Sequence, residues 1–223
     1  MVNATGPLWY PLQNYSMIER ENQPEEDHSV PTRIRRLEEQ YAETGIRRSV
    51  DAIIVTTHRG FPHILVLQVA NAFYKLPGGY LDPTESDRVG LLTRLNEQLG
   101  IPHPTKPGYV LPQGEEDWVV RDCLSTWWRP NFDTFLYPYL PAHCTTPKES
   151  KKLYLVTLPP QKTFAVPLNM KLHAVPIFEF YDNAARYGPQ FAGIPYLLSK
   201  YEFPQRHSMS EEDHEQAAAI SRL

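Results

Sequence analysis

The stretch GYLDPTESDRVGLLTRLNEQLGI, residues 79–101, decides the fold of this chain. In its second half, apolar residues recur at helical spacing: Val89, Leu92, Leu95 and Leu99. This spacing predicts an amphipathic helix, and Gly100 is a residue type that ends helices. Thr84 and Asp87 have the spacing of a capping box, which predicts that the helix begins at this pair.

The same stretch matches the spacing of the Nudix box, G-x5-E-x7-R-E-U-x-E-E-x-G-U, in which U is a bulky aliphatic residue. Six motif positions fall in register without a gap: Gly79, Glu85, Leu95, Glu97, Gly100 and Ile101. The Arg-Glu pair of the motif is Thr93-Arg94 here, and its last Glu is Gln98. The stretch therefore resembles a Nudix box that keeps the residues of the loop and helix but lacks part of the chemistry.

The changed positions lie on one side of the predicted helix, because residues 94, 97 and 98 are three and four residues apart. In an active Nudix enzyme this face is rich in carboxylates, which hold divalent cations against a polyphosphate. Here Arg94 brings a fixed positive charge, Gln98 is neutral, and Glu97 is expected to pair with Arg94. The sequence thus predicts a chain that is not an enzyme, with no catalytic residue, metal or cofactor.

The rest of the chain mixes helical and strand patterns, which predicts an α/β fold, a Nudix-type α/β/α sandwich with a mixed sheet. A first helix is expected from Ser29, as its cap, to Gly45. Strands are expected at 50–55, 64–69, 72–76, 117–123, 153–158 and 174–180, and a last helix at 195–201. Three parts are expected: an irregular N-terminal extension at 1–28, a Nudix-like domain at 29–204, and a polar, disordered C-terminal tail at 205–223.

Composition excludes several classes of function. The net charge is -4, and no run of lysines supports wrapping of nucleic acid through its phosphates. The longest apolar runs are strand-length, so no membrane partner is expected. Cys123 and Cys144 are not in a CxxC pair and are expected to be buried thiols.

Further motifs occur in order along the chain: Trp127-Trp128-Arg129-Pro130-Asn131-Phe132, Pro141-Ala142-His143, Pro147-Lys148-Glu149 and Tyr181-Asp182-Asn183-Ala184. With Gly78-Gly79 they make the chain similar, from about Leu8 to Phe203, to the small Nudix-fold subunits of cleavage factor Im (cleavage and polyadenylation specificity factor subunit 5). Residues 101–116 look longer than in that family. The resemblance implies a nuclear homodimer that binds UGUA in single-stranded pre-mRNA during 3′ end cleavage and polyadenylation. It also implies docking to the RNA-recognition domain of the larger cleavage factor Im subunit.

The resemblance further implies site residues. The family's stacking phenylalanine falls on Phe73 and its base-reading arginine on Arg33. The other implied RNA contacts are Glu25, Asp51, Tyr74, Leu76, Tyr187 and Gly188. Two positions depart from the family, since Asp51 replaces a glutamate and Ala72 replaces a threonine. The implied contacts to the larger subunit are Tyr137, Tyr139 and Leu197.

Three functions stay open at this level. A non-catalytic RNA reader fits the chemistry, because readers of single strands stack bases on rings and hydrogen-bond their edges; a nucleotide held uncleaved in the old Nudix pocket is compatible with it. A hydrolase of dinucleoside polyphosphates would rely on Glu85, Glu97 and either Asp82 or Asp87. A scaffold subunit without RNA readout is kept open by Asp51 and Ala72. From the residues alone, Phe73 is more typical of a core strand and Arg33 of a solvated helix.

Overall fold

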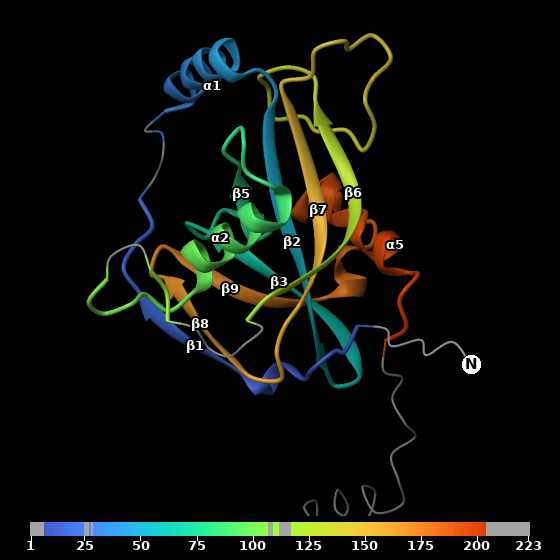
Figure 1. Ribbon diagram of the computed structural model, residues 1–223. Helices are drawn as coiled ribbons and strands as arrows, with labels where there is room; N and C mark the ends of the chain where they lie inside the picture. The colour runs from blue at the N-terminus through green and yellow to red at the C-terminus, as the bar shows by residue number, and fades with distance from the viewer. Residues whose placement is uncertain (1–6, 25–26, 28, 107–108, 112–116, 204–223) are drawn as a thin grey trace, which may run out of the picture.

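The computed structural model describes residues 7–24, 27, 29–106, 109–111 and 117–203. Its centre is a seven-stranded mixed sheet with the order β4-β3-β2-β7-β6, in which β5 pairs with β2 and β9 with β3 (Figure 1). The strands are β2 (Arg47–His58), β3 (Phe61–Val69), β4 (Phe73–Lys75), β5 (Gly78–Tyr80), β6 (Val119–Arg129), β7 (Glu149–Thr157) and β9 (Met170–Pro176). The β2–β7 pair is parallel, and the other pairings of this sheet are antiparallel.

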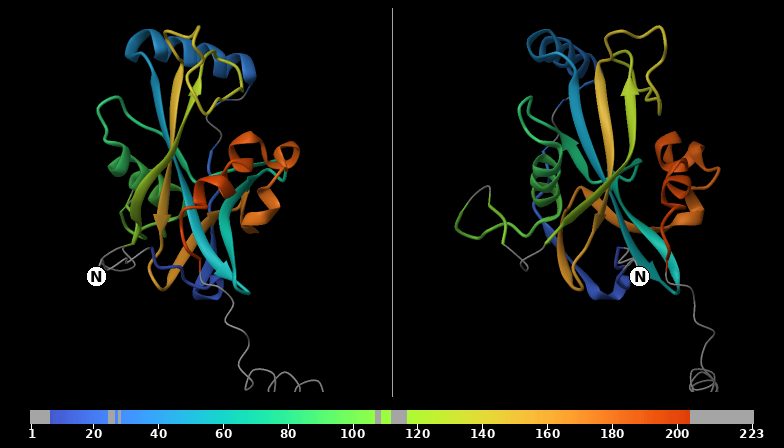
Figure 2. Two further views of the ribbon diagram at one scale, coloured as in Figure 1. Left: turned by 90° about the vertical axis from the view of Figure 1, so that its right-hand side faces the viewer. Right: turned by 45° about the vertical axis from the view of Figure 1, so that its right-hand side comes forward.

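Helices cover both faces of the sheet, as the two views of Figure 2 show. On one face lies α2 (Asp87–Leu99), and on the other lie η2 (Ile177–Phe180), α3 (Ala184–Tyr187), α4 (Pro189–Ala192) and α5 (Ile194–Leu198). Strand β2 serves both cores because successive side chains point to opposite faces. Val50, Ala52 and Ile54 join the core under α2, whereas Ile53 and Val55 join the core under the C-terminal helices. The predicted α/β/α sandwich with a mixed sheet is confirmed.

The N-terminal segment is more ordered than its sequence predicts. After η1 (Leu12–Asn14), strand β1 (Tyr15–Arg20) pairs in parallel with β8 (Lys162–Pro167) as a separate two-stranded sheet. The expectation of irregular structure was therefore wrong for these residues. Only Tyr15 of β1 is buried, so the strand has no apolar alternation that could have predicted it.

Helix α1 (Val30–Thr44) has the predicted ends. The Ser29 Oγ accepts a hydrogen bond from the Thr32 backbone N–H at 3.3 Å, and Gly45 follows with a φ of 78°. Such a positive φ is accessible to glycine at low cost. Helix α1 lies at one end of the sheet, next to the residues where β2 begins (Figure 1).

The start of α2 was predicted wrongly. The helix begins at Asp87, and Ser86 caps it by accepting a hydrogen bond from the Val89 backbone N–H at 3.4 Å. Asp87 has a tertiary role instead, because its carboxylate accepts hydrogen bonds from Lys152 at 2.6 Å and Tyr154 at 3.0 Å on β7. The cap is therefore two residues later than the local pattern indicates.

Other boundaries differ in detail. Strand β9 ends at Pro176 and η2 follows, so the strand predicted to run to residue 180 is shorter, and α5 ends at Leu198 rather than at residue 201. Cys123 is exposed rather than buried, and Cys144 is half-buried. Within the described residues, no helix combines the length and apolar character that crossing a membrane requires. The tail at 205–223 lies outside the described residues, and the domain division at 28/29 and 204/205 stays a prediction.

Candidate functional site

Gln98 holds the Pro-Gly-Gly turn in place through two hydrogen bonds to Gly78. Its Oε1 accepts a hydrogen bond from the Gly78 N–H at 3.0 Å, and its Nε2 donates to the Gly78 carbonyl. The side chain is 6% exposed. An amide can donate and accept at once, whereas an ionised carboxylate can only accept. The residue that replaces the box's last glutamate is therefore the one that satisfies both backbone groups of Gly78.

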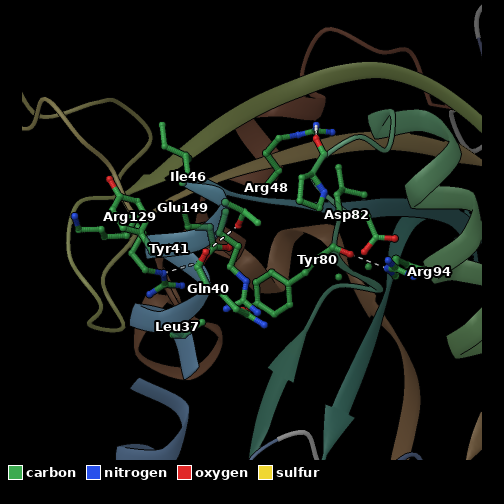
Figure 3. Close-up of a pocket in the computed structure, with 18 of the residues that line it drawn as sticks. Leu37, Gln40, Tyr41, Ile46, Arg48, Tyr80, Asp82, Arg94, Arg129 and Glu149 are labelled. Atoms are coloured by element: carbon green, nitrogen blue, oxygen red, sulfur yellow. Dashed lines mark hydrogen bonds and ion pairs between the residues drawn. The ribbon is translucent and has the colours of Figure 1, made fainter. Parts of the chain in front are cut away.

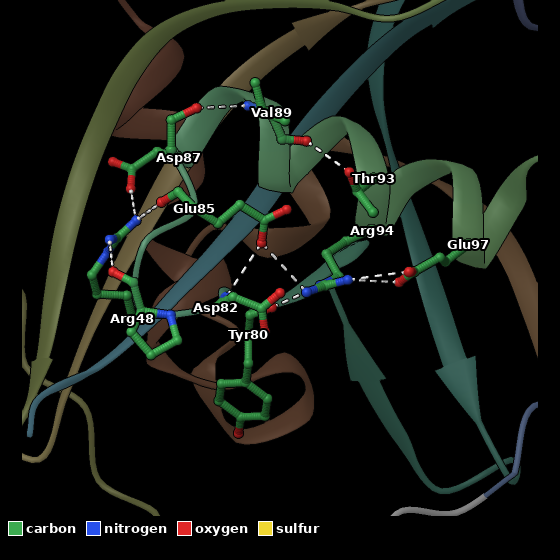
Figure 4. Close-up of polar contacts among 11 residues, drawn as sticks. Arg48, Tyr80, Asp82, Glu85, Asp87, Val89, Thr93, Arg94 and Glu97 are labelled. Carbon is green, nitrogen blue, oxygen red and sulfur yellow. Dashed lines mark hydrogen bonds and ion pairs between the residues drawn. The ribbon is translucent and has the colours of Figure 1, made fainter. Parts of the chain in front are cut away.

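Arg94 forms ion pairs with the two glutamates of the box (Figure 4). Its guanidinium lies 3.0 Å from Glu97 and 3.5 Å from Glu85, and its Nε donates to the Tyr80 carbonyl at 2.7 Å. The predicted Arg94–Glu97 pair is confirmed. A fixed cation thus pairs with both Glu85 and Glu97. Among the residues that the structure describes, no group of three or more acids, histidines or cysteines could hold a metal ion.

Next to the box, basic and acidic side chains form a row of ion pairs across strands β6, β7 and β2. The Arg129 Nε lies 2.8 Å from Glu149, and the Ser49 hydroxyl donates to the other oxygen of Glu149 at 2.6 Å. Burial opposes the ionisation of Glu149, but the charges of Lys151 and Arg129 lower the pKa of its carboxyl on balance. Glu149 is therefore a fully partnered buried anion.

Asp51 continues this row on β2. Its carboxylate lies 2.9 Å from the Lys151 Nζ, and its side chain is only 8% exposed. Burial raises the pKa of Asp51, because Lys151 offsets only part of the desolvation. Burial also lowers the pKa of the nearby Lys75, which the charge of Asp51 only partly restores. The aspartate expected to contact RNA is therefore buried and paired with Lys151.

A pocket of about 800 Å³ opens above this row of charges, between α1, the box and the adjacent ends of β6 and β7 (Figure 3). Six cationic side chains line it: Arg47, Arg48, Lys75, Arg94, Arg129 and Lys148. The acids of its lining are Glu43, Asp82, Glu97 and Glu149. Three aromatic rings, from Tyr41, Tyr80 and Phe132, also face it. Cations therefore outnumber acids in the lining although the whole chain is acidic.

Comparison with known proteins identifies the fold family. A Nudix family model described as a nucleotide hydrolase matches residues 7–201. The chain is 47% identical over 194 residues to the pre-mRNA cleavage factor Im 25 kDa subunit 2 of Arabidopsis thaliana, covering 87% of this chain and 93% of the relative. It is 43% identical over 184 residues to the cleavage and polyadenylation specificity factor subunit 5 of Dictyostelium discoideum, covering 82% and 88%. The chain belongs to the Nudix family and, within it, to the cleavage factor Im 25 kDa subunits.

A solved C. elegans Ap4A hydrolase is more distant, with a TM-score of 0.46 and 16% identity over 69% of this chain and 96% of that chain. A likeness at that level has no bearing on the function of this chain.

The RNA contacts that the family implies are distributed unevenly around the pocket. Phe73 on β4 is 56% exposed, so it is a surface ring rather than a core residue. Arg33 is exposed on α1, one turn before Leu37, which lines the pocket. Because residues four apart share a helix face, Arg33 lies on the side of α1 that faces the pocket. Leu76, at 3% exposure, belongs to the core, and Glu25 lies outside the described residues.

Two further implied contacts, the half-buried Tyr74 on β4 and the buried Tyr187 on α3, pack against each other. The Tyr74 ring lies 4.8 Å from that of Tyr187, and the Tyr187 hydroxyl donates to Glu179 at 2.6 Å. Tyr187 is 6% exposed, and Gly188 follows it with a φ of 96°. In this structure Tyr187 supports Tyr74 rather than presenting its own side chain, and the role of both residues in RNA binding stays a prediction.

The implied contacts to the larger subunit do not line the pocket. Tyr137 and Tyr139 are 36% and 60% exposed, with ring centroids 5.9 Å apart. Tyr137 exchanges two backbone hydrogen bonds with Trp128 on the outer edge of β6, at 2.7 and 2.9 Å. Leu197 on α5 is half-buried against the core under the C-terminal helices. Their role in partner binding stays a prediction.

Sequence reasoning missed the pocket residues Tyr41, Arg47, Lys75 and Phe132. Phe132 and Lys148 belong to motifs quoted above, but nothing in their spacing shows that they face Tyr41 on α1. Only the fold brings these segments together.

Proposed function

We propose that this chain is a non-catalytic nuclear subunit of a pre-mRNA cleavage and polyadenylation factor and that it binds a UGUA-type element in single-stranded RNA. Membership of the cleavage factor Im 25 kDa subunits supports the process. The observation that carries the absence of catalysis is Arg94, which ties Glu85 and Glu97 together where a hydrolase needs free carboxylates. Homodimer formation and docking to the larger subunit through Tyr137, Tyr139 and Leu197 belong to the same proposal.

The exposed ring of Phe73 supports RNA binding by this chain itself. It lies on the same short strand as Lys75, which lines the cation-rich pocket. Single-strand readers stack bases on such rings, with about 1–3 kcal/mol lost per ring removed. Arg33 adds a rigid donor fork suited to a base edge. A scaffold without RNA readout would not require an exposed ring beside a basic pocket.

Fluorescence anisotropy with UGUA RNA and a scrambled control tests the proposal. Phe73→Ala should weaken UGUA binding by about 1–3 kcal/mol. Phe61→Ala is the matched control, because Phe61 is a similarly exposed ring, at 51%, at the start of β3. Arg33→Ala should also reduce the preference for UGUA, with the exposed Arg35→Ala as its control. If both RNAs bind equally and Phe73→Ala has no effect on binding, the RNA-binding function is refuted and the chain is a scaffold subunit.

Hydrolysis is expected to be absent. The protein is incubated with diadenosine tetraphosphate, NADH or ADP-ribose and Mg²⁺ or Mn²⁺, and products are separated by chromatography. Turnover that scales with protein and is lost in Glu97→Gln would overturn the non-catalytic assignment. Binding of these nucleotides without turnover is compatible with it.

A further inference from the structure

Two cations of the pocket lie over aromatic rings. The Arg47 guanidinium lies 3.3 Å from the centroid of the Tyr80 ring. The Lys148 Nζ lies 4.1 Å from the Tyr41 ring and 5.4 Å from the Phe132 ring. A cation over a ring face is held electrostatically without using its N–H donors. Both cations are therefore positioned while their donors stay available.

These two cations differ from three arginines of the pocket. Arg48, Arg94 and Arg129 each form an ion pair with an acid. Within the described part of the chain, Arg47 and Lys148 form no ion pair.

The unpaired acids of the pocket lining are fewer than its unpaired cations among the described residues. Glu97 and Glu149 are held by Arg94 and Arg129. Glu43 and Asp82 form no ion pair among the described residues, and Lys75 is a third cation of the lining without one. The unpaired lining groups therefore carry a net positive charge, which suits an anionic ligand.

We propose that Arg47 and Lys148 bind backbone phosphates of nucleotides that flank the UGUA element. This inference rests on the proposed function. Continuity supports it: Arg33 and Tyr41 lie on one helix, and eight residues at 1.5 Å each separate them by about 12 Å. An RNA strand whose bases are read near Arg33 thus continues along α1 toward the ring-held cations. The two cations add affinity without adding sequence preference, because phosphates carry no base identity.

The test compares UGUA alone with the same element carrying cytidine flanks on both sides, using the full chain and anisotropy between 50 and 200 mM salt. Two additional phosphate contacts should steepen the log-log salt slope by about 1.4, at ~0.7 per phosphate. Over that fourfold salt range the flanked RNA should lose about sevenfold more affinity than UGUA alone. At 50 mM salt the flanked RNA should bind more tightly.

The double variant Arg47→Gln/Lys148→Gln should abolish this difference and leave binding of UGUA alone within about twofold. Arg35→Gln/Lys200→Gln is the charge-matched control, because it removes two positive charges outside the pocket lining. The same test can be made on the unaltered protein with RNA whose flanks carry uncharged methylphosphonate linkages. This comparison does not depend on whether the double variant folds.

The outcomes separate the two proposals. In one outcome, UGUA binds better than scrambled RNA while charged flanks neither increase the affinity nor steepen its salt dependence. In that case the flank contacts are refuted and the proposed RNA-binding function is retained. Equal loss of flanked and unflanked binding in the double variant would also refute them, because the cations would then belong to the readout itself. If UGUA and scrambled RNA bind alike, both proposals fall.

Discussion

Replacing Gln98 by glutamate restores the residue that the Nudix box has at this position, yet we expect it to make folding depend on pH. Gln98 is 6% exposed and binds both the N–H and the carbonyl of Gly78. A protonated glutamate can reproduce both hydrogen bonds, since its hydroxyl donates and its carbonyl accepts. An ionised glutamate leaves the Gly78 carbonyl without a donor and places a charge in a buried position.

The magnitude follows from linkage. Burial should raise the pKa of the introduced carboxyl above its ordinary value of about 4.3. A raised folded-state pKa means that Gln98→Glu keeps its stability below about pH 4.3 and loses it as the pH rises through the folded-state pKa. At ~1.4 kcal/mol per pKa unit, the loss reaches at most about 1 kcal/mol at pH 5 and about 4 kcal/mol at pH 7. For a chain of this size, the larger loss corresponds to a fall in Tm of about 8–16 °C.

The assay is thermal unfolding of Gln98→Glu and the parent chain at a series of pH values from 4.5 to 8. Glu97→Gln is the control on the same helix, because its side chain is 54% exposed and should show no such pH profile. If Gln98→Glu matches the parent at every pH, Gln98 does not hold the turn. If the variant is destabilised equally at pH 5 and pH 8, the cause is steric, and the hydrogen-bonding argument is refuted.

Three further predictions follow from the same structure. Gly78→Ala should cost more than about 4 kcal/mol in urea unfolding, because a Cβ there would lie 2.2 Å from a backbone oxygen of β2 at a φ of 149°; a smaller cost would mean that the turn can move. Glu149→Gln should lower stability at pH 7 by about 3–5 kcal/mol, the usual cost of breaking a buried pair. Since the pKa of Glu149 is lowered in the fold, its ionised carboxylate stabilises the protein above its ordinary pKa, and this stabilisation is lost as the pH falls. The free energy of unfolding of the variant should therefore fall less steeply toward acid pH than that of the parent chain. An unchanged pH dependence would contradict this. Replacing Tyr137 and Tyr139 by Ala should abolish capture by the RNA-recognition domain of the larger subunit, whereas Tyr181→Ala, at another exposed ring, should not; undiminished capture by the folded double variant would count against the assignment.

Local patterns in the sequence were enough to predict the fold class and the ion pair within the box. The spacing of residues 79–101 predicted the loop and helix, and the i, i+3 separation of Arg94 and Glu97 predicted their ion pair. The Ser29 cap of α1 was also readable, because a cap depends on three neighbouring residues. Each of these features depends on groups that are close along the chain.

The tertiary structure decided what sequence spacing could not reach. Gln98 and Gly78 are twenty residues apart, and Asp51 and Lys151 are a hundred; neither pair has a local signal. Strand β1 was invisible because its partner, β8, lies far along the chain and buries only Tyr15 of the strand. The pocket likewise requires α1, the box and the ends of β6 and β7 to meet. Among the described residues, Arg47 and Lys148 form no ion pair although the whole chain is acidic, because the fold places no described acid within ion-pair distance of them.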